Sequence, residues 1–209
     1  MRRAVLLFVK HPQPGKVKTR LAATLGPERA AAIYRTLGEA VLGGLPMEDK
    51  VWVMFDPPER QAEIAEWMRG ASGGRELRFV AQAPGDLGTR LIHAFGTAFA
   101  EGCEVAAAIG SDCVELSPAH FAEAWQALAS HDVVLGPAVD GGYYLLALRA
   151  PHPELFRDIA WSTDAVCRET LARAAAAGLR VHLLPTLRDV DTEEDWRKLS
   201  IERGAAPGF

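Results

Sequence analysis

Short apolar runs alternate with segments of helical periodicity along almost the whole chain. The runs at 4–9, 51–55, 77–81, 105–109, 133–135, 143–148 and 181–184 have the length and composition of buried strands. Between them, apolar residues recur at helical spacing, as Ile33, Leu37 and Val41 do after Pro27. This alternation predicts a mainly parallel sheet with helices on both faces.

Capping residues indicate where several of these helices begin. Asp56, Ser117 and Thr192 each precede a segment of helical periodicity. Ser162 is expected to cap a helix that runs to Gly178. Ligands of such folds bind outside the carboxyl ends of the strands, so the loops between strands and helices are the candidates for function.

The composition is that of a globular protein, and the length fits a single domain spanning residues 1–209. Apolar residues make up 49% of the chain and charged residues 24%. A formal net charge of −4 argues against electrostatic nucleic-acid binding by the whole protein. No signal-peptide pattern and no apolar run of the roughly 20 residues that span a membrane is present. The cysteines form no Cys-x-x-Cys pair, which favours free thiols, and we expect a cytoplasmic protein.

Basic residues are concentrated where the first apolar run ends. The first 20 residues hold six Lys or Arg and no Asp or Glu. The turn contains Pro14, Gly15, Lys16, Lys18 and Arg20, and it lies between a predicted strand and a helix. Backbone N–H groups, the positive end of a helix and full charges together bind phosphate there. The turn fits neither the Walker A nor the G-x-G-x-x-G pattern, and a solvated basic turn is the alternative.

Two acidic segments follow later strands. Asp112 stands after the apolar run at 105–109, and a metal ion that bridges phosphates takes one or two carboxylates. We therefore expect Asp112 to bind a metal, with Glu115 as a weaker candidate. Residues 189–195 include five acids, of which the last three suit the start of a helix. Asp191 precedes that start and is the expected second metal ligand.

Three further turns could contact a ligand. The segment Gly85-Asp86-Leu87-Gly88 lies between a strand and a helix and repeats part of the pattern of the basic turn. The segment Asp140-Gly141-Gly142-Tyr143 is either a simple hairpin turn or a place where backbone approaches a ligand. In the segment Trp161-Ser162-Thr163-Asp164, Trp161 either stacks on a ring or packs on the core.

Together, these segments resemble a bacterial family, the glycosyltransferase-like group DUF2064 of the GT-A, or nucleotide-diphospho-sugar transferase, superfamily. The resemblance rests on five ordered motifs between residue 4 and about residue 199. The motifs are Pro14-Gly15-Lys16-Val17-Lys18-Thr19-Arg20-Leu21, Gly85-Asp86-Leu87-Gly88, Gly110-Ser111-Asp112-Cys113, Asp140-Gly141-Gly142-Tyr143-Tyr144 and Trp161-Ser162-Thr163-Asp164.

This resemblance implies an α/β fold with three layers (α/β/α) and a mostly parallel central sheet with one reversed strand. It implies that a nucleotide lies across the first strands and that Asp112 occupies the metal-binding aspartate position, with Mg²⁺ or Mn²⁺ as the cofactor. Cys113 and Val114 stand where the family motif has its next positions, so a second ligand would come from Asp191. The expected nucleotide contacts are Pro14, Gly15, Lys16, Lys18, Arg20, Gly85, Asp86, Leu87 and Gly88.

The implied activity is transfer from a nucleotide donor to a small-molecule acceptor. Glycosyl transfer from a nucleotide-diphospho-sugar comes first, with Asp140 or Asp164 orienting or deprotonating the acceptor hydroxyl. Substrate contacts are expected from Gly141, Gly142, Tyr143, Trp161 and Ser162. The alternative is nucleotidyl transfer to a small phosphorylated acceptor, since Asp189-Val190-Asp191-Thr192 resembles a late element of molybdenum-cofactor and phospholactate nucleotidyltransferases. A nucleotide-binding module without catalysis and a homodimer also stay open.

Overall fold

A seven-stranded sheet forms the centre of the computed structural model, which describes residues 2–202. The strand order is β3-β2-β1-β4-β6-β5-β7. Strand β6 is antiparallel to both of its neighbours, and the other strand pairs are parallel. The strands are β1 (Arg3–Lys10), β2 (Lys50–Asp56), β3 (Leu77–Ala81), β4 (Val105–Ile109), β5 (Val133–Pro137), β6 (Tyr143–Leu148) and β7 (Val181–Leu183). The expected α/β sheet with one reversed strand is therefore confirmed.

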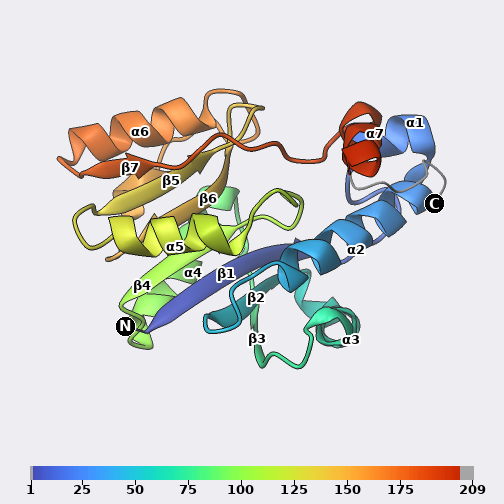
Figure 1. Cartoon of the computed structure of the whole chain (residues 1–209), viewed down its shortest axis with the longest axis horizontal. Coiled ribbons are helices and arrows are strands. Elements are labelled where there is room, and N and C mark those ends of the chain that lie inside the picture. The colour runs from blue at the N-terminus through green and yellow to red at the C-terminus, as the bar shows by residue number, and fades with distance from the viewer. Residues whose placement is uncertain (1, 203–209) are drawn as a thin grey trace.

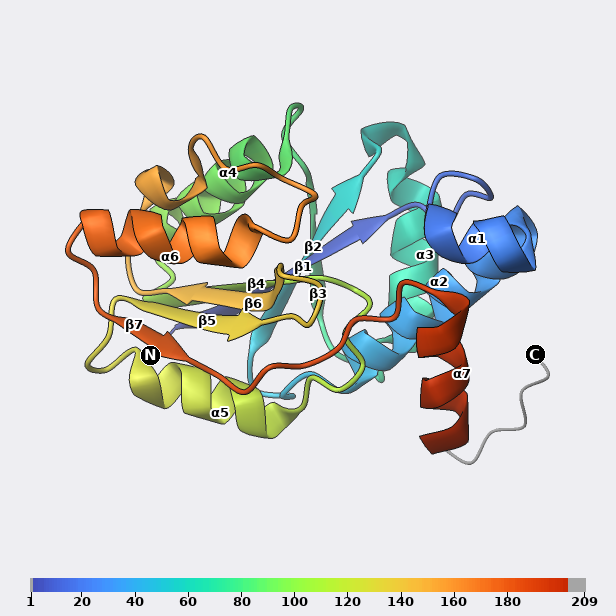
Figure 2. The same cartoon turned by 90° about the horizontal axis from the view of Figure 1, so that it is seen from above.

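Helices cover both faces of the sheet (Figures 1 and 2). The main helices are α1 (Thr19–Leu25), α2 (Pro27–Gly43), α3 (Gln61–Ala71), α4 (Leu87–Ala100), α5 (Pro118–Ala127), α6 (Val166–Ala176) and α7 (Glu193–Glu202), with short 3₁₀ turns at Pro58–Arg60 (η1) and Pro153–Phe156 (η2). Alternate residues of β1 enter different layers. Val5 and Leu7 pack with α2, α3 and α5, whereas Leu6 packs with α4, α6 and η2.

A third, smaller apolar cluster lies beyond the sheet, where α1, α2 and α7 meet. It contains Leu21, Ile33, Leu37 and Val190, with Trp196 packed against them. In Figure 2, β1 points toward α1 and α7, so this cluster supports the loops at the carboxyl end of that strand. The helix α1 itself was not predicted, because no capping side chain precedes it.

Two of the expected helix starts are wrong. Asp56 is the last residue of β2, where its carbonyl still accepts a hydrogen bond from the His11 amide, and α3 begins only at Gln61. The segment Pro58–Arg60 forms a 3₁₀ turn, so regular helix starts later than the cap pattern at Asp56 predicts. Ser162 lies in a turn with a φ of 66°, and α6 begins at Val166.

The other two expected starts are confirmed. Ser117 and His120 form reciprocal capping contacts at the start of α5. Thr192 and Asp195 do the same for α7, since the Thr192 amide donates to Asp195 Oδ2 at 2.9 Å.

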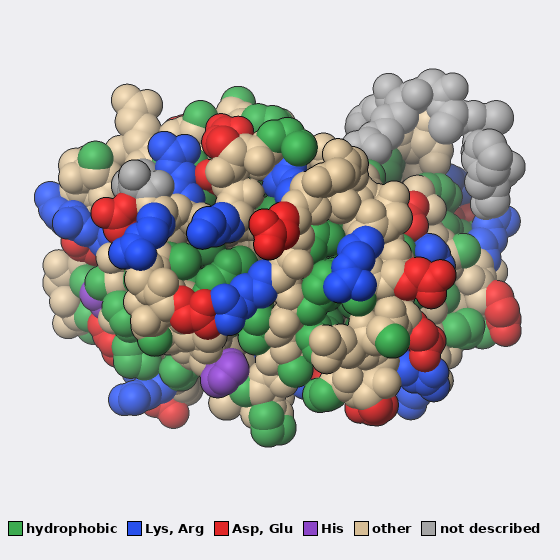
Figure 3. All heavy atoms as spheres, turned by 90° about the horizontal axis from the view of Figure 1, so that it is seen from below, with side chains coloured by type: hydrophobic (Ala, Val, Ile, Leu, Met, Phe, Trp, Pro, Cys, Tyr) green, Lys and Arg blue, Asp and Glu red, His purple; other side chains and the backbone are tan. Residues whose placement is uncertain are grey.

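The charges on the surface are mixed. On the face drawn in Figure 3, Lys and Arg side chains are interspersed with Asp and Glu and separated by hydrophobic and backbone atoms. Within residues 2–202, no helix has both the length and the apolar character needed to cross a membrane.

Candidate functional site

A cleft of about 750 Å³ lies at the carboxyl ends of β1 and β4. Parallel strands bring the loops that follow them to the same edge of the sheet, and this edge is where the basic and acidic segments meet. Nine of the expected site residues line the cleft, namely Lys16, Lys18, Gly85, Asp86, Leu87, Asp112, Trp161, Ser162 and Asp191. The sequence-based proposal that cations and carboxylates face one another therefore has a structural counterpart.

Lys18 joins the basic turn to two carboxylates that line this cleft. It is the N-cap of α1 and has left-handed backbone, with φ 46° and ψ 53°. Its side chain is only 7% exposed, and its Nζ lies 2.7 Å from Asp112 Oδ2 and 3.4 Å from Asp191 Oδ1. Burial by itself lowers the pKa of Lys18, but attraction to Asp112, Asp191 and Asp189 outweighs burial and raises it. Lys18 is therefore a cation that two carboxylates share.

Arg20 completes this charge cluster from the first turn of α1. Its Nη1 lies 3.0 Å from Asp191 Oδ2, and its side chain is 71% exposed. Both oxygens of Asp191 thus face a cation, one from Lys18 and one from Arg20. Because Arg20 is mostly in solvent, its guanidinium can turn to a phosphate at little cost, whereas Lys18 is confined.

Asp189 is a neighbour of the cluster that sequence reasoning did not select. Its Oδ1 is buried and has no hydrogen-bond partner among the described residues. Burial, followed by repulsion from Asp112 and Asp140, raises the pKa of Asp189 to about 7. The sequence predicts that acids from this segment reach the site, but only the fold shows that Asp189 is the one turned inward.

A buried hydroxyl network fixes the loop that carries Asp112. The Tyr34 hydroxyl of α2 accepts hydrogen bonds from the Lys10 amide at 2.8 Å and from Ser111 Oγ at 3.0 Å. A side chain at Gly110 would place its Cβ 2.8 Å from Asp112 Oδ1, so glycine leaves room for that carboxylate. These contacts tie α2 to the ends of β1 and β4. Tyr34 was missed because its helix was interpreted only as packing surface.

The other wall of the cleft is built around Arg90 and Gln82. Arg90 donates to Gln82 Oε1 at 2.9 Å, to Asp56 Oδ2 at 3.2 Å and to the Gly85 carbonyl at 3.1 Å. The Gln82 amide donates to the carbonyls of Val9 and Met54. Neither residue was selected from the sequence, although Gln82 directly follows a predicted strand.

Asp86 and Gly88 have structural roles in the loop before α4. Asp86 is the N-cap of the helix, and its Oδ1 accepts from the Thr89 amide at 2.8 Å. Gly88 does not line the cleft, but a Cβ there would lie 2.4 Å from the Phe156 carbonyl and 2.9 Å from Trp161 Nε1. Glycine at this position therefore lets Trp161 pack against α4 at the edge of the cleft.

The remaining expected residues lie outside the lining of the cleft. Asp140 Oδ1 accepts from the Gly142 amide at 2.9 Å, which is the contact of a local turn. Gly141 lies so close to Asp164 that a Cβ would approach the Asp164 carbonyl to 2.2 Å, so the two turns pack on each other. Tyr143 is packed into the core beside Thr170, and its burial raises its pKa. Pro14 and Gly15 also fall outside the cleft lining, in an exposed turn.

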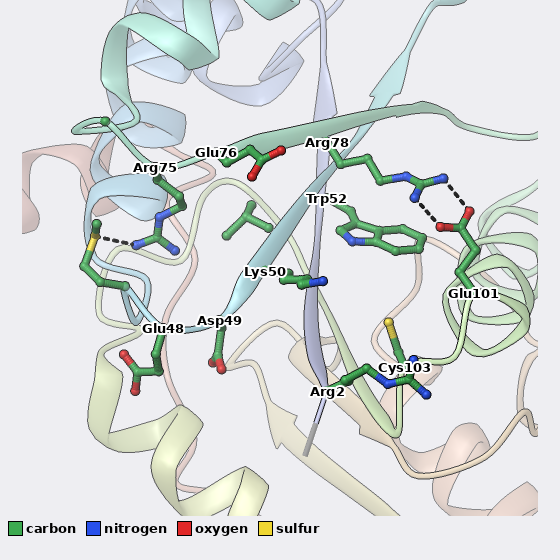
Figure 4. A pocket seen from close by; sticks show the side chains of 13 residues that line it. Arg2, Glu48, Asp49, Lys50, Trp52, Arg75, Glu76, Arg78, Glu101 and Cys103 are labelled. Carbon is green, nitrogen blue, oxygen red and sulfur yellow. Dashed lines mark hydrogen bonds and ion pairs between the residues drawn. The ribbon is translucent and has the colours of Figure 1, made fainter.

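A second cavity of about 580 Å³ lies at the opposite edge of the sheet, where β1, β2, β3 and β4 begin. Figure 4 shows Arg78 paired with Glu101 and lying over the ring of Trp52. Arg75 donates to the carbonyls of Pro46 and Leu45. None of the expected site residues lines this cavity, and its best-placed guanidinium groups already have partners within the protein.

Comparison with known proteins agrees with the arrangement of the first cleft. The family model "Uncharacterized protein conserved in bacteria (DUF2064)" matches residues 47–163. A crystal structure from Desulfovibrio desulfuricans G20, described as a "putative nucleotide-diphospho-sugar transferase", is 33% identical and has a TM-score of 0.87. The match covers 99% of this chain and 89% of that one. No curated protein matches the sequence.

More distant structures share the fold at low identity. CMP:2-keto-3-deoxy-manno-octonic acid synthetase in complex with CTP is 13% identical, with a TM-score of 0.57 and coverage of 98% of this chain and 99% of that one. Rv0371c from Mycobacterium tuberculosis H37Rv, in complex with manganese, is 14% identical, with a TM-score of 0.53 and coverage of 95% and 98%. Because the family model spans more than half of the chain and a 33% identical structure covers nearly all of it, this protein belongs to the DUF2064 family, with the fold of the nucleotide-diphospho-sugar transferases.

Proposed function

We propose that this protein is a metal-dependent transferase that moves a glycosyl group from a nucleotide-diphospho-sugar to a small-molecule acceptor. The observation that carries the proposal is that Lys16 and Lys18 line one cleft with Asp112 and Asp191, and that Arg20 pairs with Asp191 beside it. Cations that converge on a cleft at the carboxyl edge of a parallel sheet suit a polyphosphate. The neighbour structures support a nucleotide-using transferase, one of them holding CTP and another manganese.

The basic residues at the cleft would bind the phosphates of the donor, and its apolar residues would contact a ring. Lys16 is exposed at the cleft and has no ion pair among the described residues, so it is free to meet the first phosphate. Lys18 and Arg20 would then stabilise negative charge on the departing diphosphate. Trp161 and Leu87 present apolar surface at the rim, where a ring of the donor could lie.

Asp112 and Asp191 are the residues that would hold the divalent ion. Two carboxylates that converge on a single cation provide the hard oxygen donors that Mg²⁺ and Mn²⁺ take, and Lys18 shows that this point accepts positive charge. When bound there, the ion would supply positive charge to the phosphates of the donor. Asp140 and Asp164 would orient or deprotonate the acceptor hydroxyl if their two turns, which pack on each other, reach the cleft.

Nucleotidyl transfer is the second candidate, and one observation favours it. Asp140 and Asp164 do not line the cleft, and attack by a phosphorylated acceptor on the α-phosphate needs no strong protein base. In that reaction the same cations would stabilise departing pyrophosphate.

Product analysis separates these reactions. The protein is incubated with Mn²⁺ and a panel of sugar nucleotides and nucleoside triphosphates, and released phosphates are resolved by anion-exchange chromatography. Nucleoside diphosphate supports glycosyl transfer, and pyrophosphate supports nucleotidyl transfer. Binding without either product would leave a nucleotide-binding module.

A variant without the charge of Asp112 tests whether this cleft binds the nucleotide. Asp112→Asn should weaken nucleotide binding in Mn²⁺ by about tenfold or more, equivalent to roughly 1.4 kcal/mol. The matched control is Asp158→Asn, because the Asp158 side chain is 85% exposed and lies away from the cleft. Equal affinity of the Asp112 variant and the wild type would remove Asp112 from the site.

A further inference from the structure

The position that suits a divalent ion is held by a cation of the protein itself. Lys18 Nζ lies within 2.7 Å of Asp112 and 3.4 Å of Asp191, and its side chain is far more buried than either partner. The side chains of Asp112 and Asp191 are 31% and 40% exposed. The ammonium group is therefore the most buried member of the cluster, and the two carboxylates that bind it are the more accessible groups.

The charges of the four ion-paired side chains cancel. Asp112 and Asp191 carry two negative charges, and Lys18 and Arg20 carry two positive charges at distances of 2.7 to 3.4 Å. Within the described residues, no three His, Cys, Asp or Glu side chains gather into a ready metal site. A divalent ion that approached the protein alone would meet two carboxylates whose charges Lys18 and Arg20 already balance and whose oxygens are already engaged.

A polyphosphate changes this balance. Its oxygens offer Lys18 and Arg20 charge-assisted hydrogen bonds in exchange for those to the carboxylates. As the two cations turn to phosphate, the negative charges of Asp112 and Asp191 are no longer compensated, and they lie beside a second set of anionic oxygens. Phosphate and carboxylate oxygens together are the environment that Mg²⁺ and Mn²⁺ favour.

We propose that Lys18 is an exchangeable internal counterion that keeps the divalent ion out of the cleft until a polyphosphate draws the ammonium away. Metal binding is then coupled to nucleotide binding, so the two ligands enter together and the metal does not bind first. The left-handed backbone of Lys18 suits this exchange, because a non-glycine residue pays a conformational cost there that the two ion pairs offset. The inference rests on the proposed function for the identity of the polyphosphate, but not for the charge exchange.

The test measures Mn²⁺ binding without any nucleotide, by the loss of the free-ion signal in electron paramagnetic resonance. Lys18→Met removes the charge and keeps much of the length, and it should bind Mn²⁺ at least about tenfold more tightly than the wild type. Lys18→Asn is the second variant, because asparagine tolerates left-handed backbone and protects against misfolding. Thermal unfolding establishes that both variants are folded.

Lys16→Met is the matched control. Lys16 lines the same cleft, but it has no ion pair to either carboxylate among the described residues. Its loss should leave Mn²⁺ affinity within about twofold of the wild type, since no carboxylate oxygen is released. An equal gain in the Lys16 and Lys18 variants would overturn the proposal, because general electrostatics would then explain both.

The outcomes separate this inference from the proposed function. If the wild type binds Mn²⁺ alone as tightly as both Lys18 variants do, or if no variant binds it, Lys18 does not guard a metal position. That result would leave the product assay with sugar nucleotides untouched. A gain in the Lys18 variants, in a protein that releases neither nucleoside diphosphate nor pyrophosphate, would support the exchange and refute the transferase.

Discussion

The Tyr34 hydroxyl connects three elements at the floor of the cleft, and its removal should reveal how firmly they are joined. Tyr34 is 6% exposed and Ser111 is 4% exposed. The hydroxyl accepts from the Lys10 amide at 2.8 Å and from Ser111 Oγ at 3.0 Å. Tyr34→Phe keeps the ring, and its packing on Trp67, but leaves both donors without a partner.

The expected cost follows from which groups lose a partner. An unsatisfied buried donor costs about 1–3 kcal/mol, whereas removing both partners of a bond is close to neutral. Ser111→Ala removes one donor and leaves the bond from Lys10 intact, so it should cost only about 0.5–1.5 kcal/mol. Tyr34→Phe should therefore destabilise the protein by about 2–6 kcal/mol, since one amide and one hydroxyl lose their acceptor.

The double variant provides the decisive comparison. Once Tyr34 is Phe, the Ser111 hydroxyl has lost this partner, and Ser111→Ala should then be neutral or stabilising. Urea unfolding, followed by tryptophan fluorescence, gives the four free energies of the cycle. A coupling energy of about 1 kcal/mol or more is expected for a shared hydrogen bond. If Ser111→Ala costs the same in both backgrounds, the two hydroxyls are not partners and the network does not fix the loop.

Three further predictions address packing, burial and phosphate binding. Gly88→Ala should destabilise the protein by about 1–3 kcal/mol, because its Cβ would meet the Phe156 carbonyl at 2.4 Å. The control is Gly96→Ala in the same helix, whose Cβ would have no atom within 4 Å and which should stabilise the protein. Equal effects of the two substitutions in urea unfolding would refute the contact. Burial raises the pKa of Asp49, so the wild type should lose stability relative to Asp49→Asn as the pH rises above about 4. If the difference in unfolding free energy between the two proteins stays constant between about pH 4 and 8, this prediction is wrong. Arg20→Ala should weaken binding progressively from nucleoside mono- to triphosphates in calorimetric titrations, and a loss independent of phosphate number would indicate packing instead.

The sheet could be predicted from sequence because most of its strands are continuous apolar runs. The strands at 77–81, 105–109 and 143–148 have the predicted bounds to the residue. A strand that is buried on both faces leaves a run of apolar residues that polar loops interrupt on each side. The direction of β6 could not be predicted from its apolar pattern, because an antiparallel strand that is buried on both faces has the same pattern as a parallel one. The family resemblance implied one reversed strand without saying which, and the hairpin alternative for the turn at Asp140-Gly141-Gly142 indicated this pair.

The two errors in the expected helix starts have different causes, one distant and one local. Asp56 has the chemistry of a helix cap, but its backbone remains in the sheet and its carboxylate accepts a hydrogen bond from Arg90, which is 34 residues away. Ser162 precedes a helical pattern, but the Thr163 hydroxyl bonds the Ala160 carbonyl and keeps the segment in a turn. Arg90 lies outside any short window of sequence around Asp56, whereas the bond from Thr163 to Ala160 is local.

The candidate site was also predictable only in part. Parallel strands predict that the basic turn and Asp112 meet at one edge, and in the structure they do. The sharing of Lys18 between carboxylates 94 and 173 residues away was not predictable, because composition does not reveal which lysine is turned inward. Asp189 is a similar case, since it stands two residues from Asp191 in an acidic segment but is the acid with a buried, unpartnered oxygen.

The placement of Asp140 and Asp164 bears on the choice between the two proposed reactions. Glycosyl transfer to a hydroxyl gains from a carboxylate that can orient it or accept its proton, and such a group must reach the reacting atom. Asp140 instead accepts from the Gly142 amide, and Asp164 packs against Gly141. If glycosyl transfer uses Asp140 or Asp164 on the acceptor, the two turns must therefore open toward the cleft when the acceptor binds. Nucleotidyl transfer needs no such movement, so Asp140→Asn and Asp164→Asn should separate the reactions, because only a glycosyltransferase would lose turnover with nucleotide affinity unchanged.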